Sequence, residues 1–206
     1  MVKAIIFDVD GVLADSIDAV TKFNQDILEA IGYPIPTPAH VRAVFHLPRP
    51  EVLRALMGTV SDEEVSRALS VADTVPYPQY LMKTGNAVKK VVEELSATYP
   101  LGVATSKYRK TTEAYLEHAD LRHFFDTVVT FEDTAEHKPH PEPLMCAASK
   151  LGFAPHECVY IGDSNSDIAA ARACAMKIIG YSDTATAYAD SHTDTFTDIP
   201  RLIELL

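Results

Sequence analysis

Five short apolar runs, separated by longer amphipathic stretches, constrain the fold of this chain more than any other feature of its sequence. The runs are apolar at nearly every position, which is typical of strands buried on both faces of a parallel sheet. They span residues 3–7, 101–104, 127–131, 158–161 and 177–179. Helical patterns follow at 86–99, 142–151, 167–175 and 199–206. We therefore predict an α/β fold with a Rossmann-like, doubly wound parallel sheet.

The segment between the first two runs breaks this alternation, because it contains helical patterns only. Apolar residues recur there at helical spacing in four stripes, and prolines separate the stripes. We predict that residues 16–82 form an all-helical module inserted after the first strand. Residues 1–15 and 83–206 then form the core.

Net charge and composition limit the kinds of partner and the cellular compartment that we expect for this chain. The formal net charge of -11 repels phosphate backbones, so we expect no nucleic-acid partner. The sequence has no run of 18 apolar residues and no signal peptide, so we expect no membrane partner. Three cysteines match no metal or redox spacing, which favours buried thiols in a reducing cytoplasm. A monomer or weak homodimer is expected.

Polar side chains follow four of the predicted strands, where ligands bind in open α/β sheets. Asp8 and Asp10 follow the first strand, and Asp163 and Asp167 follow the fourth. The other two strands are followed by Thr105, Ser106 and Lys107, and by the loop that carries Lys138. We expect these side chains to converge on one edge of the sheet.

Carboxylates, a hydroxyl and an ammonium suit phosphoryl transfer, in which positioning and charge neutralisation do most of the work. A phosphate dianion needs cations beside so many carboxylates, and Mg²⁺ is the natural candidate because it prefers oxygen ligands. Lys138 supplies a second positive charge. The Thr105 hydroxyl and backbone N–H groups at the start of the following helix are expected to hold phosphate oxygens.

Two aspartates divide the expected chemistry. Asp8 is predicted to attack phosphorus, because an aspartyl-phosphate splits one difficult step into two easier ones. Asp10 is predicted to protonate the leaving oxygen and later to take a proton from water.

Four segments resemble the motifs of the haloacid dehalogenase-like (HAD) superfamily, and of its phosphoglycolate phosphatase-like group in particular. They are residues 8–16, 103–107, 138–141 and 162–167, and they occur in the order of the family motifs. The resemblance implies that the helical insertion is a cap that closes over substrate and sets specificity.

The resemblance also assigns roles to individual residues. It implies Asp8 as nucleophile and metal ligand, Asp10 as acid and base and as a metal ligand through its backbone carbonyl, and Asp163 as the other protein ligand. The resemblance implies that Asp167 does not bind the metal directly but supports the residues that do. It also implies that Lys138 pairs with Asp8 and with the phosphate. Gly11, Thr105 and Ser106 are expected at the phosphate.

Simpler roles compete with these at several positions. The stretch 8–11 is also typical of a solvated turn, and Thr105 and Ser106 of a helix cap. Asp163 and Asp167 suit an N-terminal cap and a helix-dipole partner. His137 and His140 are expected to pack in their loop or lie at the surface. In the helical module, His46 and Arg49 are candidate substrate contacts, with Arg49 in a loop between Pro48 and Pro50.

The leading functional hypothesis is a Mg²⁺-dependent phosphohydrolase that acts on small phosphorylated metabolites and resembles phosphoglycolate phosphatase. A phosphosugar mutase and a pyrophosphatase of the same superfamily remain open. A phosphoacceptor signalling domain would share the acidic cluster, but it is normally much shorter and has no helical insertion after its first strand. A catalytically inactive binding protein is a further alternative that the intact acidic set does not favour.

Overall fold

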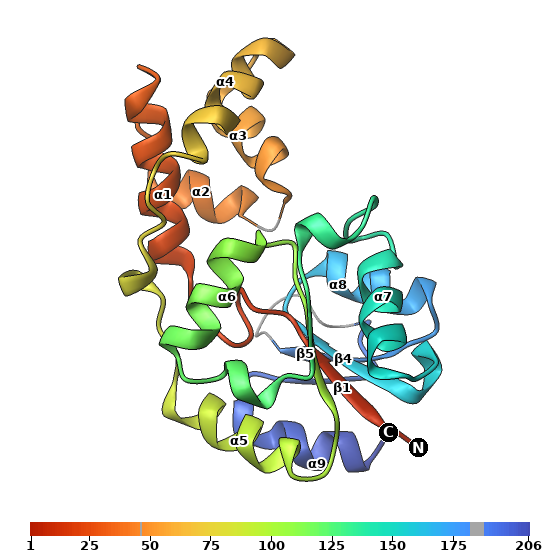
Figure 1. The fold of residues 1–206 in the computed structure, drawn as a ribbon. Helices are drawn as coiled ribbons and strands as arrows, with labels where there is room; N and C mark the ends of the chain where they lie inside the picture. The colour runs from red at the N-terminus through yellow and green to blue at the C-terminus, as the bar shows by residue number, and fades with distance from the viewer. Residues whose placement is uncertain (46, 182–187) are drawn as a thin grey trace. The chain divides into compact units, whose positions relative to one another are not determined.

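The computed structural model describes residues 1–45, 47–181 and 188–206, and the chain divides into two compact units (Figure 1). The core unit contains Met1–Asp15 and Thr84–Leu206, and the helical unit contains Ser16–Lys83. The limits read from the sequence, 16 and 82, differ from this division by one residue at one end. Within the described residues, no helix has the length and apolar character that a membrane span requires.

The core unit is built on one parallel sheet, which in the described part of the chain has six strands in the order β3-β2-β1-β4-β5-β6. All neighbouring strands pair in parallel. The strands are β1 (Ala4–Phe7), β2 (Leu101–Ala104), β3 (Thr127–Val129), β4 (Cys158–Gly162), β5 (Lys177–Tyr181) and β6 (Ser191–Thr193). The predicted α/β class is confirmed.

Two details of the sheet differ from the prediction. The third strand ends at Val129 rather than at residue 131, because Thr130 and Asp133 cap a 3-10 turn over Phe131–Asp133. The edge strand β6 is absent from the prediction, because three residues of mixed polarity carry no apolar run.

Helices of the core unit cover both faces of the sheet (Figure 1). Helices α7 and α8 pack against strands on one face, and α5 packs against α9 and the turn η5. The helices are α5 (Asn86–Ser96), α6 (Arg109–His118), α7 (Glu142–Leu151), α8 (Asn165–Ala173) and α9 (Ile199–Glu204). Short 3-10 turns are η2 (Arg122–Phe124), η3 (Phe131–Asp133), η4 (Pro155–Glu157) and η5 (Phe196–Asp198). Gly152 ends α7 in a left-handed conformation, as predicted.

The strand β1 lies at the centre of this packing. All four of its side chains are fully buried. Ala4 and Ile6 belong to the apolar cluster under α7 and α8, whereas the Phe7 ring contacts the rings of Phe125 and Phe196. Burial on both faces explains why the strand is apolar at every position.

The helical unit has an apolar core of its own. Its elements are α1 (Ile17–Ala30), α2 (Pro38–Val44), α3 (Arg49–Met57), α4 (Asp62–Ala72) and the 3-10 turn η1 (Gln79–Leu81). Helix α1 packs against α2 and α4, and the buried residues include Phe23, Ile27, Leu28, Leu53 and Ala68. Ser61 and Glu64 form a capping box that begins α4.

The strand order of the core sheet has a switch point at β1. Strand β1 pairs with β2 on one side and with β4 on the other, so β2 and β3 lie on one side of β1 and β4, β5 and β6 lie on the other. Ligands of open α/β sheets bind beyond the carboxyl ends of the strands at such a switch point. The backbone N–H of Asp8 donates to the carbonyl of Ile161 at 2.9 Å and holds the ends of β1 and β4 together.

Candidate active site

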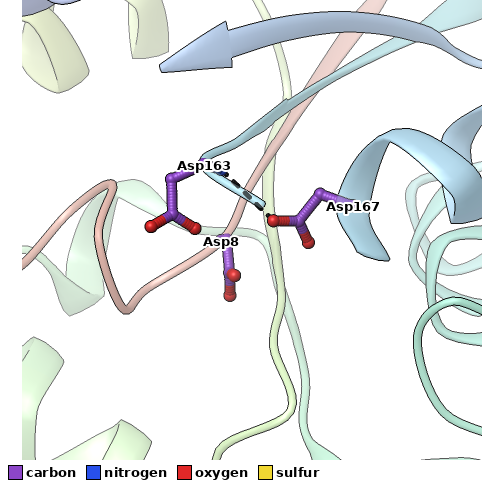
Figure 2. Close-up of side chains that lie close together, drawn as sticks. All are labelled: Asp8, Asp163 and Asp167. Carbon is purple, nitrogen blue, oxygen red and sulfur yellow. Dashed lines mark hydrogen bonds between the residues drawn. The ribbon is translucent and has the colours of Figure 1, made fainter. Parts of the chain in front are cut away.

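Three carboxylates gather at this switch point (Figure 2). Asp8 follows the last residue of β1, Asp163 follows the last residue of β4, and Asp167 lies in the first turn of α8. One oxygen atom from each lies within 4.8 Å of the others. The convergence expected for these three side chains is present in the structure.

A buried ammonium group joins two of these carboxylates. Lys138 Nζ lies 2.8 Å from Asp8 Oδ2, 2.7 Å from Asp167 Oδ1 and 2.9 Å from the hydroxyl oxygen of Tyr160. The side chain of Lys138 is only 4% exposed. An ammonium group has three N–H donors, and here three acceptors match them. The pairing of Lys138 with Asp8 that the resemblance implies is therefore found.

Asp167 both stabilises the start of α8 and contacts Lys138 in the cluster. Its Oδ2 accepts from the Ser164 hydroxyl at 2.6 Å and from the backbone N–H groups of Ser164 and Asp163, while its Oδ1 accepts from Lys138. Ser164, not Asp163, is the N-cap of α8, and Asp167 completes the capping box. Both oxygens of Asp167 thus accept hydrogen bonds from groups of the protein itself.

Two glycines let the acidic side chains approach the backbone. A Cβ atom on Gly11 would lie 1.8 Å from Asp163 Oδ2, and one on Gly162 would lie 2.5 Å from the Asp167 Cβ. Gly11 also has φ +78°, a left-handed conformation that disfavours other residues. The position of the Asp163 carboxylate therefore depends on a glycine at residue 11.

We predict that Gly11→Ala inactivates the protein by displacing Asp163. Gly152→Ala is a matched control, because Gly152 has φ +84° but no atom within 4 Å of an added Cβ. In the control, only backbone strain lowers the free energy of unfolding, by about 1–2 kcal/mol. Activity and thermal unfolding of both variants measure the difference. Equal losses of activity in the two variants would show that the contact with Asp163 has no role.

Burial, and after it the repulsion among the carboxylates, raises the pKa values of two of these groups. Burial, followed by the charges of Asp167 and Asp8, raises the pKa of Asp163 from 3.8 to about 8. Burial also raises the pKa of Asp8 to about 6, assisted by Asp167 and Asp10 and opposed by Lys138. Additional positive charge at this site would favour the ionised carboxylates near neutral pH.

The pKa of Lys138 is raised by its neighbours, which favours the charged form of this side chain. Burial lowers the pKa of Lys138, but the charges of Asp167 and Asp8 outweigh burial and hold that pKa well above its ordinary value. Lys138 is therefore a permanent cation beside Asp8 at neutral pH.

A second ion pair lies next to the cluster. Lys107 Nζ is 2.9 Å and 3.1 Å from the two carboxylate oxygens of Asp10. Sequence reasoning placed Lys107 after β2 but gave it no role, and no pattern in the sequence indicates which acid it contacts.

Thr105 and Ser106 follow β2 as expected, but the helix does not begin beside them. Helix α6 begins at Arg109, and Tyr108 occupies its N-cap position. The capping alternative for Thr105 and Ser106 is therefore wrong. The backbone N–H of Arg109 donates to the Glu132 carboxylate at 2.9 Å and 3.1 Å, so this helix start is occupied by the chain itself. Thr105 is buried, and its Oγ1 accepts from the Lys107 backbone N–H at 3.3 Å.

Tyr160 is a member of the site that sequence reasoning missed. It lies inside β4 with a fully buried side chain, and its hydroxyl donates to the Ala104 carbonyl at 2.8 Å. A tyrosine inside a buried strand needs a partner for its hydroxyl, and that is the one signal in the sequence. The hydroxyl connects Lys138 to the residue that precedes Thr105.

The remaining candidates differ in outcome. His46 lies outside the described residues. Arg49 is not in a loop, because it is the first residue of α3, and its guanidinium carbon lies 5.2 Å from the centre of the Phe23 ring. His137 packs in its loop as expected, with its ring centre 3.8 Å from that of Phe131, and His140 Nδ1 accepts from the Glu142 backbone N–H.

Comparison with known proteins shows the family to which this chain belongs. The family model described as haloacid dehalogenase-like hydrolase matches residues 5–181, a range that contains every acidic residue described above. The chain belongs to this family. The resemblance seen in the four motifs is therefore confirmed. The three aspartates of the acidic cluster of this hydrolase lie within the matched residues.

Individual relatives cover nearly the whole chain. A phosphoglycolate phosphatase of Nitrosococcus oceani is 31% identical over 98% of this chain and 96% of its own. The pyrophosphatase PpaX of Bacillus velezensis is 30% identical over 87% of this chain and 82% of its own. The crystal structure of a HAD-superfamily hydrolase of subfamily IA from Geobacter sulfurreducens has a TM-score of 0.80 and 28% identity, with 100% of both chains covered.

Proposed function

We propose that this hydrolase cleaves small phosphate monoesters by transferring the phosphoryl group to Asp8. One observation carries the proposal: the Asp8 carboxylate lies at the sheet edge with its Oδ2 2.8 Å from a buried, permanently charged Lys138. A buried carboxylate that is held by a cation in a cluster of further acids is an unusual arrangement for a purely structural role. It provides a nucleophile and a positive charge at the place where ligands bind.

The proposed reaction has two steps. An Asp8 oxygen forms a bond to phosphorus as the ester P–O bond breaks, and Asp10 gives a proton to the leaving oxygen. A water molecule then attacks the phosphorus of the aspartyl-phosphate while Asp10 takes a proton, which releases inorganic phosphate and frees Asp8. Lys138 balances charge on the phosphoryl oxygens, and Gly11, Thr105 and Ser106 hold those oxygens.

The donor set fits Mg²⁺, which we propose as the cofactor. The carboxylates of Asp8 and Asp163 and the backbone carbonyl of Asp10 would hold it, because hard oxygen donors are the ligands that Mg²⁺ prefers. Asp167 would stay with its partners Lys138 and Ser164. When bound, Mg²⁺ supplies charge neutralisation for the substrate phosphate and for the clustered carboxylates.

Thermal unfolding tests the metal site without relying on activity. The pKa of Asp163 rises from 3.8 to about 8 on folding, so without a cation the folded protein binds more protons than the unfolded chain over this interval. Stability without metal is therefore expected to fall as pH rises through it. Mg²⁺ opposes this loss, so it is expected to raise the Tm by several degrees at pH 8 and by less at pH 5.

Two controls accompany this measurement. Asp163→Asn removes a proposed ligand and is expected to lose most of the Mg²⁺-dependent rise in Tm. EDTA is expected to silence turnover, and added Mg²⁺ to restore it. Full activity after chelation, or a Tm that does not respond to Mg²⁺ at either pH, would remove the metal from the account.

The substrate is proposed to be a small phosphorylated metabolite, and the helical unit, residues 16–83, is proposed to act as the cap that selects it. The relative from Nitrosococcus oceani supports phosphoglycolate, and the relative from Bacillus velezensis supports pyrophosphate as a second candidate. The net charge of -11 supports a small ligand over a nucleic acid. The free thiols of Cys146, Cys158 and Cys174 support a cytoplasmic location.

A substrate panel tests the function. Phosphoglycolate, pyrophosphate, sugar phosphates and nucleotides are assayed with Mg²⁺ for release of inorganic phosphate. We expect turnover of at least one small ester or of pyrophosphate, and the ranking of kcat/KM separates the two candidates. A purified, folded protein that releases phosphate from none of these compounds, nor from an aryl phosphate, would overturn the proposal.

A further inference from the structure

Lys107 is a buried ammonium group held against Asp10. Its side chain is 6% exposed, and its Nζ contacts both carboxylate oxygens of Asp10, at 2.9 Å and 3.1 Å. Lysine is almost never this deeply buried unless it is paired, because desolvating an ammonium group is costly. The contact with both oxygens restricts rotation of the Asp10 carboxylate more than a single hydrogen bond would.

The backbone around Lys107 is fixed from both sides. The Lys107 carbonyl accepts from the Phe131 backbone N–H at 3.0 Å, and the Lys107 N–H donates to Thr105 Oγ1. The ring of the next residue, Tyr108, stacks on Phe131 with ring centres 4.8 Å apart. Lys107 therefore reaches Asp10 from a rigid position rather than from a mobile surface loop.

The charges around Asp10 explain why a tether is needed. Asp10 lies two residues from Asp8 and beside the acidic cluster, and its charge contributes to the raised pKa values of Asp8 and Asp163. Repulsion among like charges favours any orientation of Asp10 that leads away from the cluster. The contact of Lys107 with both oxygens selects one orientation of the Asp10 carboxylate. Among the described residues, the cluster of acids that could share a metal contains Asp8, Asp163 and Asp167 but not Asp10.

We propose that Lys107 is a positioning residue that orients the Asp10 carboxyl group for its proton transfers. An ammonium N–H can donate to a carboxyl oxygen in either protonation state, so the tether acts in both steps of the reaction. The proposal rests on the proposed function. It makes Lys107 act through Asp10, whereas a lysine that binds phosphate directly would act independently of Asp10.

A double-mutant cycle separates these roles. Lys107→Met, Asp10→Asn and the double variant are compared by kcat/KM with Mg²⁺ on an alkyl phosphate and on an aryl phosphate. Lys107→Met is expected to lower kcat/KM about 100-fold on the alkyl ester, whose leaving oxygen needs a proton, and about tenfold or less on the aryl ester. In the Asp10→Asn background the same change is expected to alter kcat/KM by less than about threefold.

Further variants control for charge and for folding. Lys107→Arg keeps a cation that can pair with a carboxylate and is expected to recover part of the lost activity. Lys110→Met removes an exposed lysine of the same helix region and is expected to behave as wild type. Where melting shows that Lys107→Met does not fold, Lys107→Gln replaces it in the cycle.

The outcomes distinguish the proposal from the proposed function. Wild-type turnover and its loss in Asp8→Asn establish the function in the same assay. Given those two results, an equal loss from Lys107→Met with and without Asp10, or a raised inhibition constant for inorganic phosphate, would overturn the positioning role and leave the function standing. A wild-type protein inactive on both esters would overturn both.

Discussion

Asp8→Asn is expected to abolish turnover while the fold persists. An amide oxygen is a poor nucleophile, so the aspartyl-phosphate cannot form, and kcat/KM for an aryl phosphate should fall on the order of 10⁴-fold or more. The fold should survive because an asparagine oxygen can still accept from Lys138, as Asp8 Oδ2 does at 2.8 Å. The raised pKa of Asp8 shows that its charge is disfavoured in the folded protein, so removing that charge should leave the Tm unchanged or higher.

A matched control isolates the site from a general effect of charge. Asp120→Asn removes an exposed carboxylate that pairs with Lys89 at the surface of the core unit, and its activity should equal that of the wild type. Both variants are assayed with Mg²⁺ and melted under the same conditions. Near-normal turnover by Asp8→Asn would refute the nucleophile, and a collapsed Tm would assign Asp8 to the fold.

Lys138→Met is expected to damage both stability and activity. The ammonium group satisfies Asp8, Asp167 and the Tyr160 hydroxyl, and the side chain is 4% exposed. Removing one partner of a buried ion pair leaves an uncompensated charge, which typically costs about 3–5 kcal/mol. Turnover should fall by about 10²–10³-fold, as for loss of one preorganised donor to the reacting group.

The pH range of this stabilisation follows from the raised pKa of Lys138. A group whose pKa is higher in the folded protein stabilises it fully below its unfolded value, 10.5, and loses that effect only as pH rises through the folded value. The full loss should therefore appear at neutral pH. Adding Asp167→Asn to Lys138→Met removes one of the stranded charges and should restore part of the stability.

A surface pair provides the comparison for Lys138. Lys89→Met breaks an ion pair whose lysine is 43% exposed, and the free energy of unfolding should change by less than about 1 kcal/mol. Denaturant unfolding of the two lysine variants measures the difference. If the free energy of unfolding changed by the same small amount in both variants, the charge of Lys138 would not be what stabilises the buried acidic cluster.

Much of the core was predictable because burial on two faces leaves a direct mark on the sequence. Ala4 to Phe7 are apolar at every position since each packs against a layer of helices, and the same holds for Leu101–Ala104. Topology then places Asp8, Thr105 and Asp163 at one edge, because the ends of parallel strands meet there. Position just after the end of a predicted strand therefore carried most of the information about the site.

Pairing between side chains was not predictable in the same way. The sequence places Lys107 after a strand, but its selection of Asp10 depends on the path of a four-residue link to α6. Glu132, not a ligand, accepts from the start of α6, because a 3-10 turn after β3 brings it there. Arg49 looked like a loop residue between two prolines, yet prolines suit the first turn of a helix, and α3 begins there.

Trapping the phosphorylated intermediate tests the central claim most directly. The protein is mixed with substrate and Mg²⁺, quenched in acid during turnover, reduced with borodeuteride and mapped by mass spectrometry, because borohydride converts an acyl phosphate to the corresponding alcohol. The account predicts deuterated homoserine at position 8 in the wild type, and none in a sample treated without substrate. Label at any other carboxylate, or an unlabelled Asp8 in a protein that is turning over, would contradict it.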